Sequence, residues 1–201
     1  VPDILTISKA LGGGKRAIGA MVTTAELSRQ AYGKRKDSAL HSTTFGGLGE
    51  SCAVAIEALN IISDQIFLDS VEKKGSYFIE KLIQLKIKYP KIIKEIVGKG
   101  LYIGIVFDFI NYEKHLKKLK IPFITDMKIV LMGSIIRCLY REYGLLTHFT
   151  PPRPDILVIM PALIIKESEI DYFVDSIDKI LKIGLLRLFK KFLIGNIKDL
   201  V

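Results

Sequence analysis

"SKALGGGKRAIGA", residues 8–20, places a single lysine, Lys9, shortly before three consecutive glycines. Glycine lets the backbone turn sharply and approach a bulky group closely. Two interpretations of Lys9 stay open at this point: a solvated lysine at a strand end, or a partly buried amine that condenses with a carbonyl compound. The apolar residues on either side, 3–8 and 17–24, predict two short buried strands that flank a glycine-rich turn.

"HSTTFGGLGE", residues 41–50, is the second stretch whose composition indicates a site. The hydroxyls of Thr43 and Thr44 could hold a phosphate together with the glycine N–H groups. The same composition is also typical of an ordinary hydroxyl-rich turn. The glycine-rich stretch itself is not a nucleotide loop, because it has neither the GxxxxGK[ST] nor the GxGxxG spacing.

The rest of the chain alternates helical and extended segments, which predicts a regular α+β block. Helices are expected over residues 50–63, from Asp64 to Pro90, over 126–143 with Asp126 as N-cap and Gly144 as the stop, and over about 167–182. The first of these helices has one apolar face, made of Cys52, Ala55, Ile56, Leu59 and Ile62. Residues 100–109 alternate as a half-buried strand, and 151–165 supply a loop and another strand.

Composition and charge exclude several classes of protein. With 49% apolar residues and a mean hydropathy of +0.32, disorder is not expected, and charges interrupt every candidate membrane span. The net charge of +9 comes from lysines spread along helix faces, so we attribute it to compositional bias and expect no nucleic-acid partner. The two cysteines and three histidines show no metal-ligand spacing, so we expect no metal and a reducing cytoplasm.

The two quoted stretches resemble, in order, two motifs of the class III aminotransferases, which use pyridoxal phosphate. The pattern PD-(I/L)-x-T-x-(A/S)-K-x-L-GGG-x-P-I-G-A surrounds the lysine that forms the Schiff base in that family, and here that lysine is Lys9. The last Thr of H-x-(S/T)-T-(F/Y)-GG holds the cofactor phosphate of the neighbouring subunit. This resemblance implies Thr44 as the phosphate ligand, with Thr43 beside it, and it extends over residues 1–183.

The resemblance implies an α/β architecture of the aspartate-aminotransferase type (pyridoxal-phosphate fold type I). Residues 1–63 would be the end of the cofactor-binding large domain, 64–183 a connecting helix and the small α+β domain, and 184–201 an amphipathic basic tail. It also implies a homodimer with shared active sites that moves an amino group from an amine or amino acid to a keto acid. Because the family's cofactor-binding half precedes the lysine, the chain is expected to be the C-terminal portion of a longer protein. A non-catalytic remnant is the alternative.

Three further departures from the family pattern bear on the site. Lys15, Arg16 and Ala17 replace a hydrophobic residue and Pro, and "LG" at 48–49 replaces Asn-Pro, near the expected dimer contact. Val158 stands where many members have an arginine that clamps the substrate carboxylate. Arg153, in a predicted loop, is a substitute to consider; otherwise an amine or atypical amino-acid donor is favoured.

The tail, residues 184–201, has an apolar stripe that could lie on a membrane surface. Packing on a partner subunit or on the preceding half of the protein is the favoured expectation, because such stripes are more often buried against protein. The stripe consists of Leu185, Leu188, Phe189, Phe192 and Leu193.

Overall fold

The computed structural model describes residues 2–37, 39–44, 46–117 and 126–198. The chain divides into two units, Val1–Leu68 and Asp69–Val201, and the division falls inside helix α3 (Gln65–Lys88). The first unit contains the lysine and threonine stretches, and the second contains most of the hydrophobic core.

In the first unit, β1 (Ile4–Ile7) pairs antiparallel with β2 (Ala20–Thr23), and the 3-10 helix η1 (Lys9–Gly12) lies in the turn between them. The two strands were predicted correctly, but the prediction that they are buried is wrong. Ile4 is 56% exposed and Val22 is 51% exposed. The reason is that β1 and β2 form a two-stranded sheet, without a further strand among the described residues to cover them.

The remaining elements of this unit are helical. They are α1 (Ala25–Tyr32), the 3-10 helix η2 (Arg35–Asp37) and α2 (Gly49–Ile62). Helix α1 begins at Thr24, whose side-chain oxygen accepts a hydrogen bond from the backbone N–H of Leu27 at 3.2 Å. Helix α2 was predicted within one residue at each end. Of its predicted apolar face, Ala55 is buried, and Cys52, Ile56, Leu59 and Ile62 are exposed.

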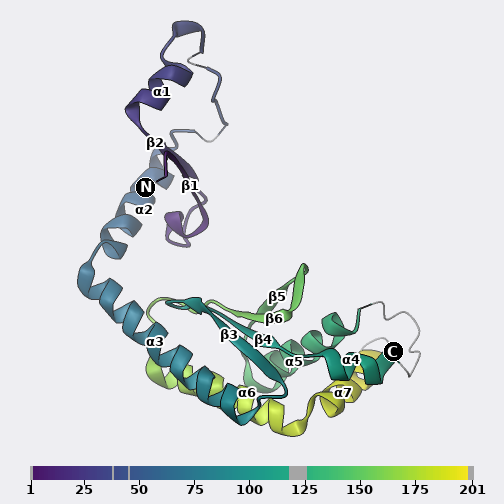
Figure 1. The fold of residues 1–201 in the computed structure, drawn as a ribbon. Helices are drawn as coiled ribbons and strands as arrows, with labels where there is room; N and C mark the ends of the chain where they lie inside the picture. Colours follow the sequence, from purple (N-terminus) through teal and green to yellow (C-terminus); the bar gives the residue numbers. More distant parts are fainter. Residues whose placement is uncertain (1, 38, 45, 118–125, 199–201) are drawn as a thin grey trace. The chain divides into compact units, whose positions relative to one another are not determined.

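The second unit is one antiparallel sheet with helices on one face, as Figure 1 shows. Its strands run in the order β3 (Ile93–Lys99), β4 (Tyr102–Phe107), β6 (Arg153–Ile159) and β5 (His148–Thr150). Its helices after α3 are α4 (Ile110–Lys117), α5 (Met127–Tyr143), α6 (Glu167–Ile183) and α7 (Leu185–Lys198). The apolar sides of these helices and the sheet enclose one hydrophobic core.

Strand β4 is more deeply buried than its alternation predicts. Ile103, Ile105 and Phe107 are buried as expected, but Gly104 and Val106 on the other face are buried too. The strand is central, and a Cβ atom at Gly104 would lie 2.9 Å from Ile156 and 3.0 Å from Val97, side chains of the two neighbouring strands. The half-buried prediction therefore holds at Tyr102, which is 60% exposed, but is wrong at Gly104 and Val106.

Helix α5 confirms both predicted caps. Asp126 accepts a hydrogen bond from the backbone N–H of Lys128 at 2.8 Å, and Gly144 ends the helix with a φ of 67°. Its buried face includes Leu131, Met132, Ile135 and Leu139, each 0% exposed.

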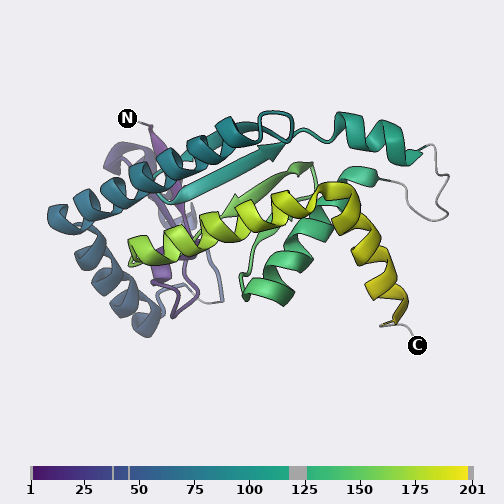
Figure 2. The ribbon, with the colours of Figure 1, turned by 90° about the horizontal axis from the view of Figure 1, so that it is seen from below.

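Helices α3 and α6 run side by side beneath the sheet, as Figure 2 shows, and two polar clusters join them. Tyr77 on α3 donates a hydrogen bond to Asp171 on α6 at 2.8 Å, and Tyr89, just after α3, donates to Asp178 at the same distance. Burial alone would raise the pKa of Asp178, but hydrogen bonds from Lys182, Lys88 and Tyr89 outweigh burial and lower it to about 2. Burial and the same carboxylate raise the pKa of Tyr89 to about 12.

The tail forms α7, which packs on α5 of its own chain. Leu185, Leu188 and Phe189 are at most 4% exposed, and the ring of Phe192 faces the Arg137 guanidinium of α5 at 5.6 Å. The apolar stripe is therefore present as predicted. Its buried residues pack within the same unit, whereas packing on a partner subunit or on the preceding half of the protein had been expected. Helix α5 offers them an apolar surface.

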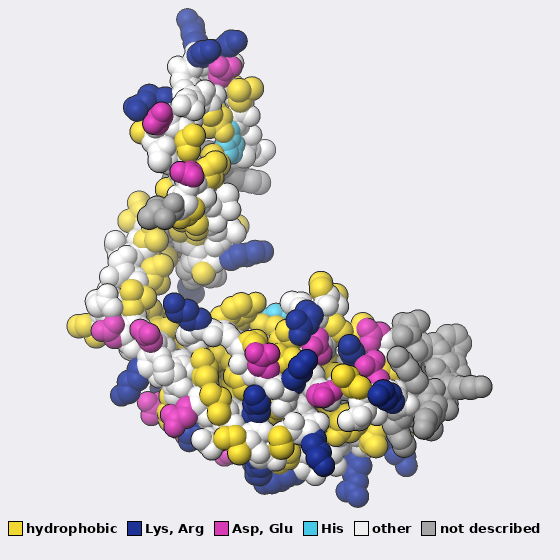
Figure 3. Space-filling view, viewed as in Figure 1, with side chains coloured by type: hydrophobic (Ala, Val, Ile, Leu, Met, Phe, Trp, Pro, Cys, Tyr) yellow, Lys and Arg dark blue, Asp and Glu magenta, His cyan; other side chains and the backbone are white. Residues whose placement is uncertain are grey.

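Positive and negative side chains are interspersed on the viewed surface of the second unit, as Figure 3 shows. No single helix of the described residues is long and apolar enough to cross a membrane. Helices α2 and α3, bent by 70° at the break between them, meet that test only as a pair and only by length and composition.

Candidate functional site

Lys9 has a backbone conformation that is unusual for a residue with a side chain. It is separated from β1 by Ser8 alone, begins η1 and has a φ of 58°. It is the only non-glycine residue with positive φ in the described part of the chain. In this left-handed region the Cβ of an L-residue is crowded by the following carbonyl, and such residues gather at functional sites. The side chain of Lys9 is exposed in this chain, so the partial burial considered from the sequence is not observed.

The loop that carries Lys9 rests on α2. A Cβ atom at Gly13 would lie 3.3 Å from the Cβ of Ala58, so backbone and helix are in close contact there. Ser51 and Ala55, the buried residues of α2, lie on the same face as Ala58 at helical spacing. The larger apolar residues assigned to the buried face are exposed, with Ile56 at 60%. Small side chains allow the close approach that larger ones prevent.

An ion pair makes a second contact between this loop and α2. The Arg16 guanidinium donates to the carboxylate of Glu50, in the first turn of α2. The backbone N–H of Arg16 also donates to the carbonyl of Gly12 at 3.2 Å, and that of Lys15 donates to the same carbonyl at 2.9 Å. Arg16 is thus joined through backbone to the end of η1 and through its side chain to α2.

The threonine stretch forms a loop before α2. The backbone N–H of Gly46 donates to the carbonyl of Thr43 at 3.1 Å, and Gly47 has a φ of 72°. Thr43 and Thr44 both expose their side chains. The hydroxyl of Tyr32, at the end of α1, lies 3.3 Å from Nδ1 of His41 and joins this loop to α1.

An open cleft of about 650 Å³ lies along the threonine loop. Of the predicted site residues, Thr43 lines this cleft, whereas Lys9 and Thr44 are not among the described residues that do. The other lining residues are Gly19, Met21, Tyr32, His41, Ser42 and Gly46.

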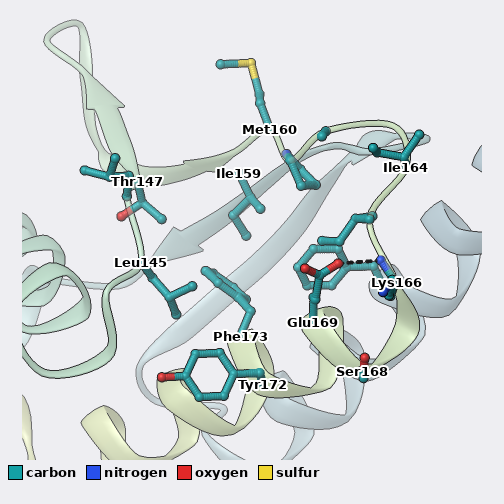
Figure 4. A pocket seen from close by; sticks show the side chains of 15 residues that line it. Leu145, Thr147, Ile159, Met160, Ile164, Lys166, Ser168, Glu169, Tyr172 and Phe173 are labelled. Atoms are coloured by element: carbon teal, nitrogen blue, oxygen red, sulfur yellow. Dashed lines mark hydrogen bonds between the residues drawn. The ribbon is translucent and has the colours of Figure 1, made fainter.

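The second unit contains a cavity of about 600 Å³ between the end of β6, the loop that follows it and the start of α6 (Figure 4). Its wall is mostly apolar, with Phe173 and Ile159 turned toward it. At its rim the backbone N–H of Lys166 donates to the Glu169 carboxylate at 2.8 Å, which caps α6.

Neither Val158, which stands at the position of the expected arginine, nor Arg153, the substitute considered for it, is available as a carboxylate ligand. Val158 is 6% exposed in β6, where it lies opposite Gly104 and His148 of the neighbouring strands. Arg153 is the first residue of β6 and not a loop residue, and both of its hydrogen bonds to Asp155 measure 3.0 Å. This pairing raises the pKa of Arg153 and lowers that of Asp155.

Sequence reasoning missed the Arg16–Glu50 and Tyr32–His41 contacts. Arg16 had been noted only as a departure from the family pattern, and its partner lies 34 residues away. In the described part of the chain, no group of three or more His, Cys, Asp or Glu side chains is arranged to hold a metal ion.

Comparison with known proteins gives a consistent result. The family model described as Aminotransferase class-III matches residues 1–181. An acetylornithine aminotransferase of Caldanaerobacter subterraneus is 35% identical over 90% of this chain, and one of Methanocaldococcus jannaschii is 34% identical over 89%. The chain spans only 38% and 37% of the length of these two relatives.

Solved structures agree on the fold. A transaminase from a marine Virgibacillus superposes with a TM-score of 0.72 at 19% identity, over 95% of this chain and 40% of that one. The chain therefore has the α/β fold of the transaminases, as the sequence predicted.

Proposed function

We propose, since the chain belongs to the class III aminotransferase family, that the protein transfers an amino group from an amine or amino acid to a keto acid, with Lys9 as the residue that bonds to pyridoxal phosphate. The proposal is carried by Lys9, which combines the family's lysine motif with a left-handed backbone. Strain of that kind persists only where the surrounding structure holds it.

The residues present fit the cofactor that class III aminotransferases use. Lys9 offers an exposed amine for the cofactor's aldehyde, and Gly14 has a φ of 71° with no atom within 4 Å of the place of a Cβ. The threonine loop offers exposed hydroxyls beside glycines, a donor set suited to a phosphate. We assign Thr44, supported by Thr43, to the phosphate.

Bound pyridoxal phosphate supplies an electron sink for charge that develops on the substrate carbon. The chain supplies the proton transfer. Once the incoming amine has displaced it from the cofactor, the Nζ atom of Lys9 would take the proton from the substrate carbon as general base and would deliver it to the cofactor carbon as general acid. Its place at the start of a short 3-10 helix limits the movement of its Cα.

We further propose that two copies of the protein share their sites. Within one chain, the cleft beside the threonine loop is lined by Thr43 and not by Lys9, as far as the described residues show. A threonine loop that binds the cofactor phosphate at the lysine of a second subunit does not have to lie beside Lys9 of its own chain. Size-exclusion chromatography with light scattering measures the subunit number directly.

The class of amino donor that we propose is inferred from Val158 and Arg153. Val158 is buried and apolar and has no donor for a carboxylate, and Arg153 is already paired with Asp155. We propose that the amino donor is an amine, or an amino acid whose carboxylate is bound elsewhere. A comparison of amines with α-amino acids as donors tests this assignment.

The function itself is tested with the product of the complete gene. Lys9→Ala should abolish amino transfer and the visible absorbance of the bound cofactor, whereas Lys15→Ala, an exposed lysine of the same loop, should retain both. A Lys9→Ala variant with unchanged turnover and spectrum would contradict the proposal.

The second candidate is a non-catalytic remnant of such an enzyme. It is favoured by the exposed side chain of Lys9, which is not among the described residues that line the cleft beside the threonine loop. A complete gene product that neither binds pyridoxal phosphate nor transfers amino groups would support it, and one that does both would exclude it.

A further inference from the structure

We infer that Arg16 is a positioning residue for Lys9, acting through its ion pair with Glu50. The inference rests on the proposed function, because it assigns a role in holding the lysine that bonds to the cofactor. It adds a residue pair from two different motifs of the chain, the lysine loop and the first turn of α2.

The geometry provides two separate attachments of one loop to one helix. Gly13 contacts Ala58, and Arg16 pairs with Glu50. Glu50 and Ala58 are eight residues apart on α2, which is about 12 Å along the helix axis at 1.5 Å per residue. A loop held at one point can rotate about it, whereas two points this far apart fix its direction as well as its position.

The path from Arg16 to Lys9 is short. The Arg16 N–H is bonded to the carbonyl of Gly12, the last residue of η1, and Lys9 is the first. Within η1 and its cap, the N–H of Leu11 donates to the carbonyl of Ser8 at 3.2 Å, and that of Gly13 donates to Ala10 at 2.9 Å. Movement of Arg16 is therefore transmitted over one short hydrogen-bonded segment.

The need for this restraint comes from the backbone of Lys9. A left-handed conformation is unfavourable for a residue with a Cβ, so the segment relaxes unless its surroundings hold it. The side chains of Arg16 and Glu50 are 50% and 63% exposed, so their pairing is modest in strength and weakened by salt. The expected effects are accordingly a few-fold and not complete losses.

The experiment uses the product of the complete gene and the variants Arg16→Ala, Glu50→Ala, the double variant and Arg16→Lys. The matched control is Lys191→Ala, which removes another exposed ion pair, to Glu142 at 3.0 Å, in the second unit. The first measurement is hydrogen–deuterium exchange of residues 9–16 without cofactor. The second is the dissociation constant of pyridoxal phosphate, followed by visible absorbance.

Arg16→Ala and Glu50→Ala should each raise exchange in residues 9–16 and the dissociation constant by about twofold to fivefold. The double variant should add little to either single change, since both remove the same pair. Arg16→Lys should show smaller increases in both measurements than Arg16→Ala. High salt should raise the exchange and the dissociation constant of the unsubstituted protein toward the values of Arg16→Ala. Lys191→Ala should change neither measurement.

Failure of the inference is distinguishable from failure of the proposed function. If the unsubstituted protein binds pyridoxal phosphate but Arg16→Ala matches it in both measurements, the inference is wrong and the function stands. If the unsubstituted protein does not bind the cofactor, the proposed function fails, and the positioning role falls with it. Effects of equal size in Lys191→Ala would also overturn the inference, because they would show a general loss of stability.

Discussion

Gly13 and Ala58 are in close contact: a Cβ atom added at Gly13 would lie 3.3 Å from the Cβ of Ala58. This contact places the loop that carries Lys9 against the small-residue face of α2. It explains why α2 buries Ser51 and Ala55 while its larger apolar side chains stay exposed. The contact can be tested without altering Lys9.

Gly13→Ala should disturb the lysine loop more than Gly14→Ala. Both glycines have positive φ, 58° and 71°, so each substitution costs about 1–2 kcal/mol in backbone strain. Only at Gly13 does the new methyl meet α2, whereas nothing lies within 4 Å at Gly14. The dissociation constant of pyridoxal phosphate should rise further for Gly13→Ala, and equal values for the two variants would argue against the packing described here.

Gly75→Ala should destabilise the second unit by about 3 kcal/mol, because overpacking forces the backbone to shift. A Cβ at Gly75 on α3 would lie 2.6 Å from the carbonyl carbon of Gly100, which is backbone and cannot rotate away. The control is Gly133→Ala in α5, whose Cβ would be 3.7 Å from Phe192, an ordinary contact. Urea denaturation should show Gly133→Ala to be neutral or slightly stabilising; a similar loss in both would contradict the account.

Leu188→Ala should lower the free energy of unfolding by about 2–4 kcal/mol, since it leaves a cavity between α7 and the core. Leu188 is 3% exposed, whereas Leu186 on the same helix is 40% exposed and serves as the control. Leu186→Ala should cost less than about 1 kcal/mol. The free energy of unfolding separates the two, and a tail that tolerates both substitutions equally would not be packed on α5.

Asp178→Asn should lower stability at neutral pH and have a smaller effect in acid. The pKa of Asp178 is lowered from 3.8 to about 2 in the folded protein, so its contribution is complete above 3.8 and is lost as the pH falls toward 2. The difference in unfolding free energy from the unsubstituted protein should be about 2 kcal/mol at pH 7 and narrow by about 1 kcal/mol at pH 3. Asp175→Asn, an exposed position of the same helix, is the control; a difference independent of pH would refute the pairing with Lys88 and Lys182.

Features set by local chemistry could be predicted from the sequence. The caps at Asp126 and Gly144, the end of α3 before Pro90 and the turn between β1 and β2 all follow from residues within a few positions of each other. Strand β3 was missed because its Lys and Glu residues interrupt the apolar alternation, and β5 because it is only three residues long.

Features that depend on distant partners could not be predicted. The pairing of Arg16 with Glu50 joins residues 34 positions apart, and the periodicity of the sequence does not predict such a contact. The predicted apolar face of α2 included Ile56, Leu59 and Ile62, which are exposed, because the contact with the lysine loop is made by small side chains such as Ala58. Only Ala55 of that predicted face is buried. The sequence does not predict the left-handed backbone of Lys9 either, since the residues around it are also compatible with an ordinary strand end.

Borohydride trapping tests the central claim most directly. The complete gene product is mixed with pyridoxal phosphate, reduced, digested, and its modified lysines are located by mass spectrometry. The account predicts label concentrated on Lys9, over the exposed Lys15 of the same loop and the other lysines of the chain. Label spread evenly over surface lysines, with Lys9 no more modified than Lys15, would contradict it.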